Sequence, residues 1–102
     1  MSTLTIHDLH LRHSRLEAGE VILDVRTPEE FSAGHVPGSL NIPHDQIANY
    51  IGDLRAYKII YIHCKMGGRA KAAYEELQDL GFSNVSCVSD AGMNAWIEAG
   101  YP

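Results

Sequence analysis

The chain has 102 residues and a mass of 11.3 kDa, which is the size of one domain at roughly 100 to 200 residues per domain. Apolar residues make up 45% of it and charged residues 21%, which excludes disordered, collagen-like and coiled-coil chains. Eight Lys and Arg against 13 Asp and Glu give a net charge of -5, so no overall basic field recruits nucleic acid or an anionic membrane. Any anionic ligand must therefore be bound by a local site.

Cysteine usage and the N-terminal segment predict where the protein works. Two cysteines are too few to staple a small secreted domain, so we expect free thiols in a reducing compartment. The first residues lack the basic and apolar regions of a secretory signal. No apolar run reaches the roughly 20 residues of a membrane-spanning helix. These observations predict a cytoplasmic protein.

Strand-like and helical segments alternate along the chain. Short runs rich in β-branched and apolar residues predict strands over 4–6, 21–23, 39–42, 58–62 and 85–88. Helical patterns predict helices over 7–16, 28–32, 44–54, 68–80 and 92–99. The clearest of these helices ends just before Gly81, a residue that favours a helix C-terminus. The alternation predicts an α/β domain with a central, mainly parallel sheet of about five strands flanked by helices on both faces.

Functional residues in such a fold lie where strands end and helices begin. Asp24 and Arg26 follow one predicted strand, and the segment from His63 to Arg69 follows another. Cys64 should therefore lie at a helix N-terminus, where unpaired N–H groups and the helix dipole favour a thiolate. Lys65 and Arg69 add positive charge nearby. The pattern predicts that Cys64 is a nucleophile.

Two adjacent glycines strengthen this interpretation. Gly67 and Gly68 allow the backbone to turn N–H groups inward around one anion, as in an anion-binding nest. The alternative is that Cys64 is an inert buried thiol and that the glycines form an ordinary loop before a helix. The cysteine, glycine pair, arginine, strand end and helix start all fall within six residues, which favours the functional interpretation.

The chain resembles the single-domain rhodanese, or thiosulfate sulfurtransferase-like, family. The resemblance extends along nearly the whole chain and rests on motifs at 22–26, 30–31, 34–39 and 41–43, the loop Cys-Lys-Met-Gly-Gly-Arg at 64–69, and the segment 92–96. It implies a rhodanese-like domain over residues 1–102, with transfer of a sulfane sulfur through a persulfide on Cys64. The loop residues implied to bind substrate are Lys65, Met66, Gly67, Gly68 and Arg69.

The resemblance also implies the substrates. The Cys64 thiolate would take the outer sulfur of thiosulfate or of a persulfide and pass it to cyanide or to a thiol. A protein could serve as sulfur donor or acceptor, and the reaction needs neither a metal nor an organic cofactor. Asp24 and Arg26 are expected to pair with each other and to support the loop, and Arg26 could also meet Glu30.

Three alternatives to this enzyme share parts of the pattern. Cysteine phosphatases place five residues between cysteine and arginine, whereas four lie between Cys64 and Arg69 here. The shorter ring suits a sulfur atom better than a phosphoryl group. Arsenate reduction remains open because some family members with related loops handle that tetrahedral anion. A non-enzymatic persulfide carrier or partner-binding module is the third alternative.

Several other residues have a structural explanation. His7, His10 and His13 have helical spacing but do not converge on one ion, so we expect a solvated face rather than a metal site. His35 is expected to form a structural hydrogen bond. His63 should point to the sheet face opposite Cys64.

The second cysteine and the residues around the loop complete the expectations. Cys87 has no charge or glycine nest around it and should be a buried structural thiol. Met66 and Met93 could form an apolar wall beside the sulfur, or simply fill the core. Asp90 and Ala91 depart from the paired glycines common in the family, which would weaken the binding of small dianions.

Overall fold

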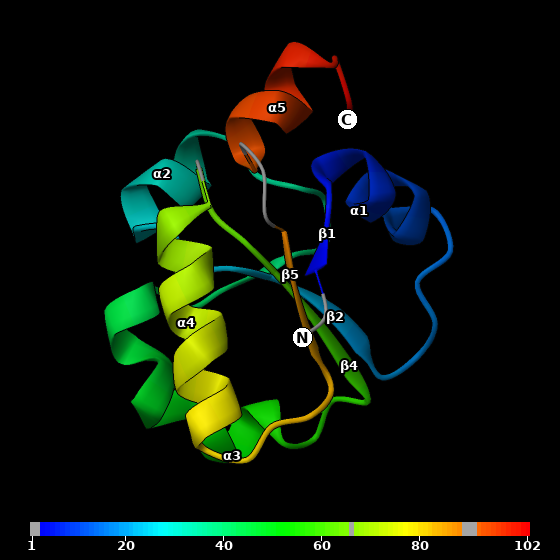
Figure 1. Ribbon diagram of the computed structural model, residues 1–102. Helices are drawn as coiled ribbons and strands as arrows, with labels where there is room; N and C mark the ends of the chain where they lie inside the picture. The colour runs from blue at the N-terminus through cyan, green and yellow to red at the C-terminus, as the bar shows by residue number, and fades with distance from the viewer. Residues whose placement is uncertain (1–2, 66, 89–91) are drawn as a thin grey trace.

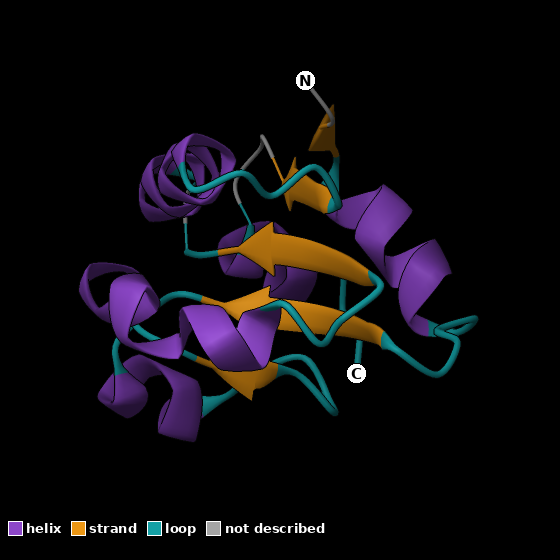
Figure 2. Ribbon diagram, turned by 90° about the horizontal axis from the view of Figure 1, so that it is seen from below, coloured by secondary structure: helices purple, strands orange, loops and turns teal. Residues whose placement is uncertain are grey.

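The computed structural model describes residues 3–65, 67–88 and 92–102. Its centre is a five-stranded sheet in the order β1-β5-β4-β2-β3, and every neighbouring pair is parallel (Figures 1 and 2). The strands are β1 (Thr3–Leu4), β2 (Glu20–Asp24), β3 (Leu40–Asn41), β4 (Ile59–His63) and β5 (Val85–Val88). The predicted α/β class and parallel sheet are confirmed.

Helices cover both faces of this sheet, as predicted. They are α1 (Ile6–His13), α2 (Pro28–Ala33), the 3-10 helix η1 (His44–Tyr50), α3 (Ile51–Leu54), α4 (Gly68–Asp79) and α5 (Met93–Glu98). Buried residues of α1 and α5 form the core on one face, and buried residues of η1, α3 and α4 form the core on the other. No helix in the described part of the chain is long and apolar enough to cross a membrane.

Several predicted boundaries shift by one to three residues, and two of the differences have a clear local cause. The strand expected over 4–6 stops at Leu4 because Thr5 caps α1: its hydroxyl accepts the Asp8 N–H, and the Asp8 carboxylate accepts the Thr5 N–H. The helix expected over 44–54 is divided at Tyr50, whose φ of -119° and ψ of 16° leave the helical region. The first part is a 3-10 helix that buries only Ile47.

Side chains of β4 alternate between the two faces, and this alternation positions the site. Ile60 and Ile62 point into the core beneath α4, and Cys64 joins the same core just after the strand. Tyr61 belongs to the core beneath α1 and α5. The strand therefore delivers Cys64 to the α4 side at the carboxyl edge of the sheet.

Candidate active site

The sulfur of Cys64 lies at the N-terminus of α4. Its Sγ accepts the N–H of Gly67 at 3.0 Å and the N–H of Ala70 at 3.3 Å. Only 1% of the Cys64 surface is exposed, so the cysteine is almost completely buried at the carboxyl edge of the sheet. Backbone donors aimed at one sulfur stabilise negative charge on it. Sequence reasoning missed Ala70, although the first N–H groups of any helix lack helical acceptors and are candidates for this role.

The two glycines of the loop have different roles. Gly67 precedes α4 with φ at 103°, a left-handed conformation that favours glycine, and this turn aims its N–H at the sulfur. Gly68 is the first residue of α4, and a Cβ atom added there would meet nothing within 4 Å. Of these two glycines, only Gly67 has a backbone conformation that requires glycine.

Helix α5 holds the backbone of the loop from behind. The Met93 N–H donates to the Cys64 carbonyl oxygen at 2.8 Å, and the Asn94 N–H donates to that of Lys65 at 3.3 Å. Gly92, with φ at 57°, packs directly against the same Cys64 carbonyl. The Met93 side chain packs with Trp96 in the core beneath α1 and α5, which is the core-filling alternative for this methionine.

Arg69 is bound by a carboxylate from α2. Its Nη1 and Nη2 donate to the two oxygens of Glu30 at 2.6 and 3.0 Å. Glu30 also accepts the N–H and hydroxyl of Thr27, which caps α2. The Arg69 hydrogen bonds, followed by those of Thr27, lower the pKa of Glu30 to about 2. The Arg26–Glu30 contact that the sequence left possible does not form, because Glu30 pairs with Arg69 and Arg26 pairs with Asp24.

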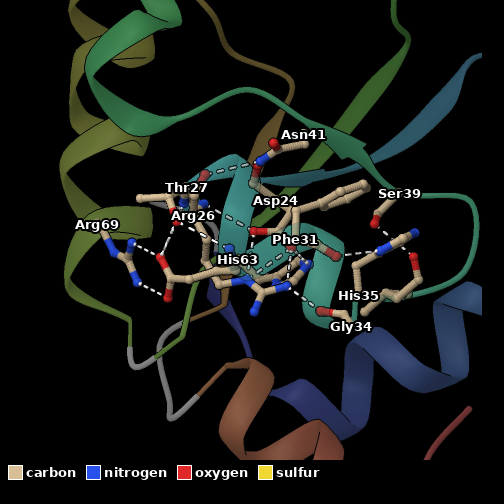
Figure 3. A network of polar contacts seen from close by, with 12 residues as sticks. Asp24, Arg26, Thr27, Phe31, Gly34, His35, Ser39, Asn41, His63 and Arg69 are labelled. Carbon is tan, nitrogen blue, oxygen red and sulfur yellow. Dashed lines mark hydrogen bonds and ion pairs between the residues drawn. The ribbon is translucent and has the colours of Figure 1, made fainter.

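Asp24 and Arg26 form a buried ion pair beside the loop (Figure 3). Arg26 Nη2 and Nε donate to the Asp24 carboxylate at 2.7 and 3.0 Å. The same Nη2 donates to the Gly34 carbonyl at 2.7 Å, and Asn41 Nδ2 donates to the Asp24 and Arg26 carbonyls. The pairing expected between Asp24 and Arg26 is confirmed, and it ties the turn after β2 to the segment after α2.

His63 is buried behind the loop on the opposite face from Cys64. Its side chain is 0% exposed, and neither ring nitrogen has a hydrogen-bond partner among the described residues. The Asp24 carboxylate lies 3.9 Å from Nε2. Burial lowers the pKa of His63, and the attraction of Asp24 opposes this only in part. The ring is therefore a neutral group packed into the base of the site.

The other histidines hold structural contacts. His35 Nδ1 hydrogen-bonds the Phe31 carbonyl at 2.8 Å, as expected. The solvated face expected for the histidines of α1 is confirmed for His7, which is exposed, but not for His10 and His13, which are half-buried. His10 stacks on Tyr101 with 3.7 Å between ring centroids, and His7 hydrogen-bonds the Tyr101 hydroxyl at 2.6 Å. His13 meets the Trp96 ring edge to face. These contacts fasten α5 and the segment after it to α1.

Cys87 lies in the core beneath α4, in register with Ile62 of β4. Burial raises the pKa of its thiol to about 11. Strand spacing and rise place its Cα roughly 8 Å from that of Cys64, which is too far for a disulfide without backbone movement. Both cysteines are free thiols.

The remaining predicted site residues divide into two groups. Lys65 is exposed at the surface of the loop. Met66, Asp90 and Ala91 lie outside the described residues. Within the described part of the chain, no three His, Cys, Asp or Glu side chains are grouped as metal ligands would be.

Comparison with known proteins identifies the family. The model of the rhodanese-like domain matches residues 10–99, so the chain belongs to the rhodanese family. It is 34% identical to thiosulfate sulfurtransferase 16 of Arabidopsis thaliana, a chloroplast protein, over 88% of this chain and 84% of the relative. It is also 34% identical to the thiosulfate sulfurtransferase GlpE of Pseudomonas syringae, over 78% of this chain and 74% of the relative.

A solved structure from Rhodopseudomonas palustris has a very similar fold. It matches with a TM-score of 0.90 and 28% identity, covering 100% of this chain and 83% of the other. That protein is described as one of unknown function and a possible tyrosine phosphatase. The relatives thus carry two kinds of name, and the geometry around Cys64 is needed to choose between them.

Proposed function

We propose that this protein is a sulfurtransferase that carries a sulfane sulfur on Cys64 as a persulfide. The observation that supports the proposal most directly is the pair of N–H groups, from Gly67 and Ala70, that converge on one sulfur atom. The thiosulfate sulfurtransferase names of the two relatives support the same reaction. Thiosulfate or a persulfide would be the donor, and cyanide or a thiol the acceptor.

In the first half-reaction the Cys64 thiolate attacks the outer sulfur of the donor. A new S–S bond forms on Cys64, the S–S bond of the donor breaks, and the leaving group departs with the electron pair as sulfite or a thiolate. The negative charge remains on sulfur throughout, so the donors from Gly67 and Ala70 stabilise the reactant and the persulfide product. Lys65, Met66, Gly68 and Arg69 form the rest of the proposed substrate-binding loop.

In the second half-reaction the acceptor attacks the terminal sulfur of the persulfide. Cyanide leaves as thiocyanate and a thiol leaves as a new persulfide, and in both cases the electron pair of the S–S bond returns to Cys64. The site supports this exchange because the Glu30–Arg69 pair and the start of α5 hold the loop from two sides. An acceptor protein would have to present its thiol at the loop surface, near Lys65.

The alternative is hydrolysis of a phosphate ester, suggested by the name of the Rhodopseudomonas neighbour. Two features of the loop favour sulfur transfer. Four residues separate Cys64 from Arg69, and the Arg69 guanidinium already binds Glu30 through two hydrogen bonds. Phosphoryl transfer would need this guanidinium on the oxygens of the reacting phosphorus. Sulfur transfer instead keeps the reacting charge on sulfur atoms, which the N–H groups of Gly67 and Ala70 face.

Mass spectrometry of the intact protein tests the proposal. Thiosulfate should add one sulfur atom to Cys64, and cyanide should then remove it and release thiocyanate. Cys64→Ser should abolish the gain, whereas the matched Cys87→Ser variant should keep it. Failure to gain a sulfur from thiosulfate or from a thiol persulfide, together with hydrolysis of an aryl phosphate, would overturn the proposal. Because both thiols are free, the proposal places this chemistry in a reducing compartment such as the cytoplasm.

A further inference from the structure

The arginine of the loop is electrically neutralised by Glu30. Two hydrogen bonds join the planar guanidinium of Arg69 to both carboxylate oxygens, which is the bidentate geometry that Arg prefers for anions. The side chains of both residues are 29% exposed, so the pair lies at the rim of the site and not in the core. An incoming anion therefore meets an occupied guanidinium.

Glu30 is held in place by more than Arg69. The Thr27 N–H and hydroxyl both donate to its Oε1, and the Thr27 hydroxyl in turn accepts the Glu30 N–H as the cap of α2. Its lowered pKa keeps the carboxylate charged at any pH at which the protein works. The negative charge at this rim is consequently fixed in position and present at all times.

Few positively charged side chains near the loop remain available to bind a small anionic donor. Among the described residues near the loop, Arg26 is bound to Asp24 and to Gly34, Arg69 is bound to Glu30, and Lys65 is exposed to solvent. The chain as a whole carries a net charge of -5. Each additional negative charge on a donor therefore adds repulsion without a free guanidinium to offset it.

We propose that Glu30 determines donor specificity by selecting sulfur donors that carry one negative charge over dianionic thiosulfate. The inference rests on the proposed sulfur-transfer function and adds a substrate class to it. Suitable donors are simple organic thiosulfonates and simple alkyl persulfides, each of which carries one negative charge in total, whereas thiosulfate carries two. Glu30 acts here through Arg69 and through its own field, as a specificity-determining residue that does not react.

Thiosulfate and methanethiosulfonate form a matched pair of probes. In both, the Cys64 thiolate attacks the outer sulfur and the S–S bond breaks; the leaving group is sulfite in the first case and methanesulfinate in the second. The bond that forms and the sulfur that moves are the same in the two reactions. The probes differ mainly in one oxyanion replaced by a methyl group, and hence in one unit of charge.

The experiment compares the rates at which the two probes load sulfur onto Cys64 in the wild type, in Glu30→Gln and in Glu29→Gln. Glutamine keeps the size and capping ability of Glu30 while removing its charge. Because Coulomb energy scales with donor charge, we expect loading to rise about threefold for methanethiosulfonate and about tenfold for thiosulfate in Glu30→Gln. Glu29 is exposed on the same helix, so Glu29→Gln makes the same charge change without touching Arg69.

Each outcome has a definite meaning. The inference is supported if methanethiosulfonate loads the wild type faster than thiosulfate does. The ratio of the two loading rates should also fall in Glu30→Gln and stay unchanged in Glu29→Gln. Equal loading of wild type by both probes overturns it without any variant, so the test survives a Glu30→Gln protein that does not fold. Equal shifts in the two variants also overturn it. If neither probe, nor a thiol persulfide, adds sulfur to Cys64, the proposed function itself fails.

Discussion

Gly92 lies against the carbonyl oxygen of Cys64 so closely that a Cβ atom added at Gly92 would overlap that oxygen. The next residue, Met93, donates its N–H to the same oxygen. The start of α5 therefore fixes the peptide of Cys64 itself, and does so through backbone atoms. Only a residue without a side chain allows this approach, and its φ of 57° adds a second reason for glycine.

Replacing Gly92 by alanine should detach α5 from the loop. We expect Gly92→Ala to cost about 2 to 4 kcal/mol of unfolding free energy, from backbone strain and from the overlap with Cys64. Sulfur loading should fall more than tenfold, since the loop must move. Gly100→Ala is the matched control: Gly100 also has positive φ, at 76°, but has open space around it, so it should cost only about 1 kcal/mol. Urea unfolding measures both free energies of unfolding. Equal decreases in the two variants would show that the contact of Gly92 with Cys64 contributes no stability of its own.

The buried neutral ring of His63 predicts an acid-sensitive fold. Its pKa in the folded protein lies below the ordinary value of 6.5, so the unfolded chain binds the proton more readily. The stability that depends on the neutral ring is complete above about pH 6.5 and falls below it, by up to about 1.4 kcal/mol per pH unit.

His63→Leu should remove this part of the pH dependence. The ring nitrogens have no partners among the described residues, and replacing such a group by an apolar side chain of similar size is neutral or stabilising. We therefore expect unchanged or higher stability at pH 7 and a flatter decline between pH 6.5 and 4.5. His44→Gln, at the half-buried start of η1, serves as the comparison. A large loss of stability in His63→Leu at pH 7 would contradict a packing role for the ring.

Arg26 should matter for stability more than for chemistry. Arg26→Ala leaves the Asp24 carboxylate buried, at 0% exposure, without its ion-pair partner, and losses of about 3 to 5 kcal/mol are typical of this change. Arg15→Ala removes an exposed arginine and should change stability by less than about 0.5 kcal/mol. The measurement is thermal unfolding alongside sulfur loading at low temperature. An Arg26→Ala protein of full stability and no activity would assign Arg26 to the reaction instead.

Cys87 should stay unreactive in the native protein. With its pKa raised to about 11, roughly one molecule in a thousand carries the thiolate at pH 8, and the side chain is buried. Iodoacetamide at pH 8 should therefore leave Cys87 unmodified in the native state and modify both cysteines in denaturant. Peptide mass spectrometry reads the two sites separately. Rapid native alkylation of Cys87 would show that β5 opens far more often than its packing implies.

The sheet and the position of Cys64 between a strand and a helix are predictable because local signals determine them. Short apolar runs mark the strands, and Cys64 stands between a strand and a helix in the sequence itself. The capping of α1 by Thr5 was overlooked, although Thr and Asp three residues apart give a local signal of their own. The break at Tyr50 has no comparable signal, since the pattern over 44–54 suits one amphipathic helix.

The partners of the charged residues were less predictable. From the sequence, Arg26 is the arginine that could meet Glu30. Only the tertiary structure, which brings Arg69 of α4 to α2, pairs Glu30 with Arg69. The sequence predicts exposed histidines on α1 because their ring partners, Trp96 and Tyr101, lie near the other end of the sequence. Contacts of this kind depend on tertiary structure and have no periodicity to reveal them.

The docking of α5 on the loop also sets the order in which the site can form during synthesis. A ribosome releases Cys64 well before Met93, and β4 before its neighbour β5, so the partners that hold the Cys64 backbone come later in the chain. Contacts between distant segments make folding slow and cooperative. A chain that has not yet delivered α5 lacks the backbone support of the loop, which ties the competence of Cys64 to the completion of the fold.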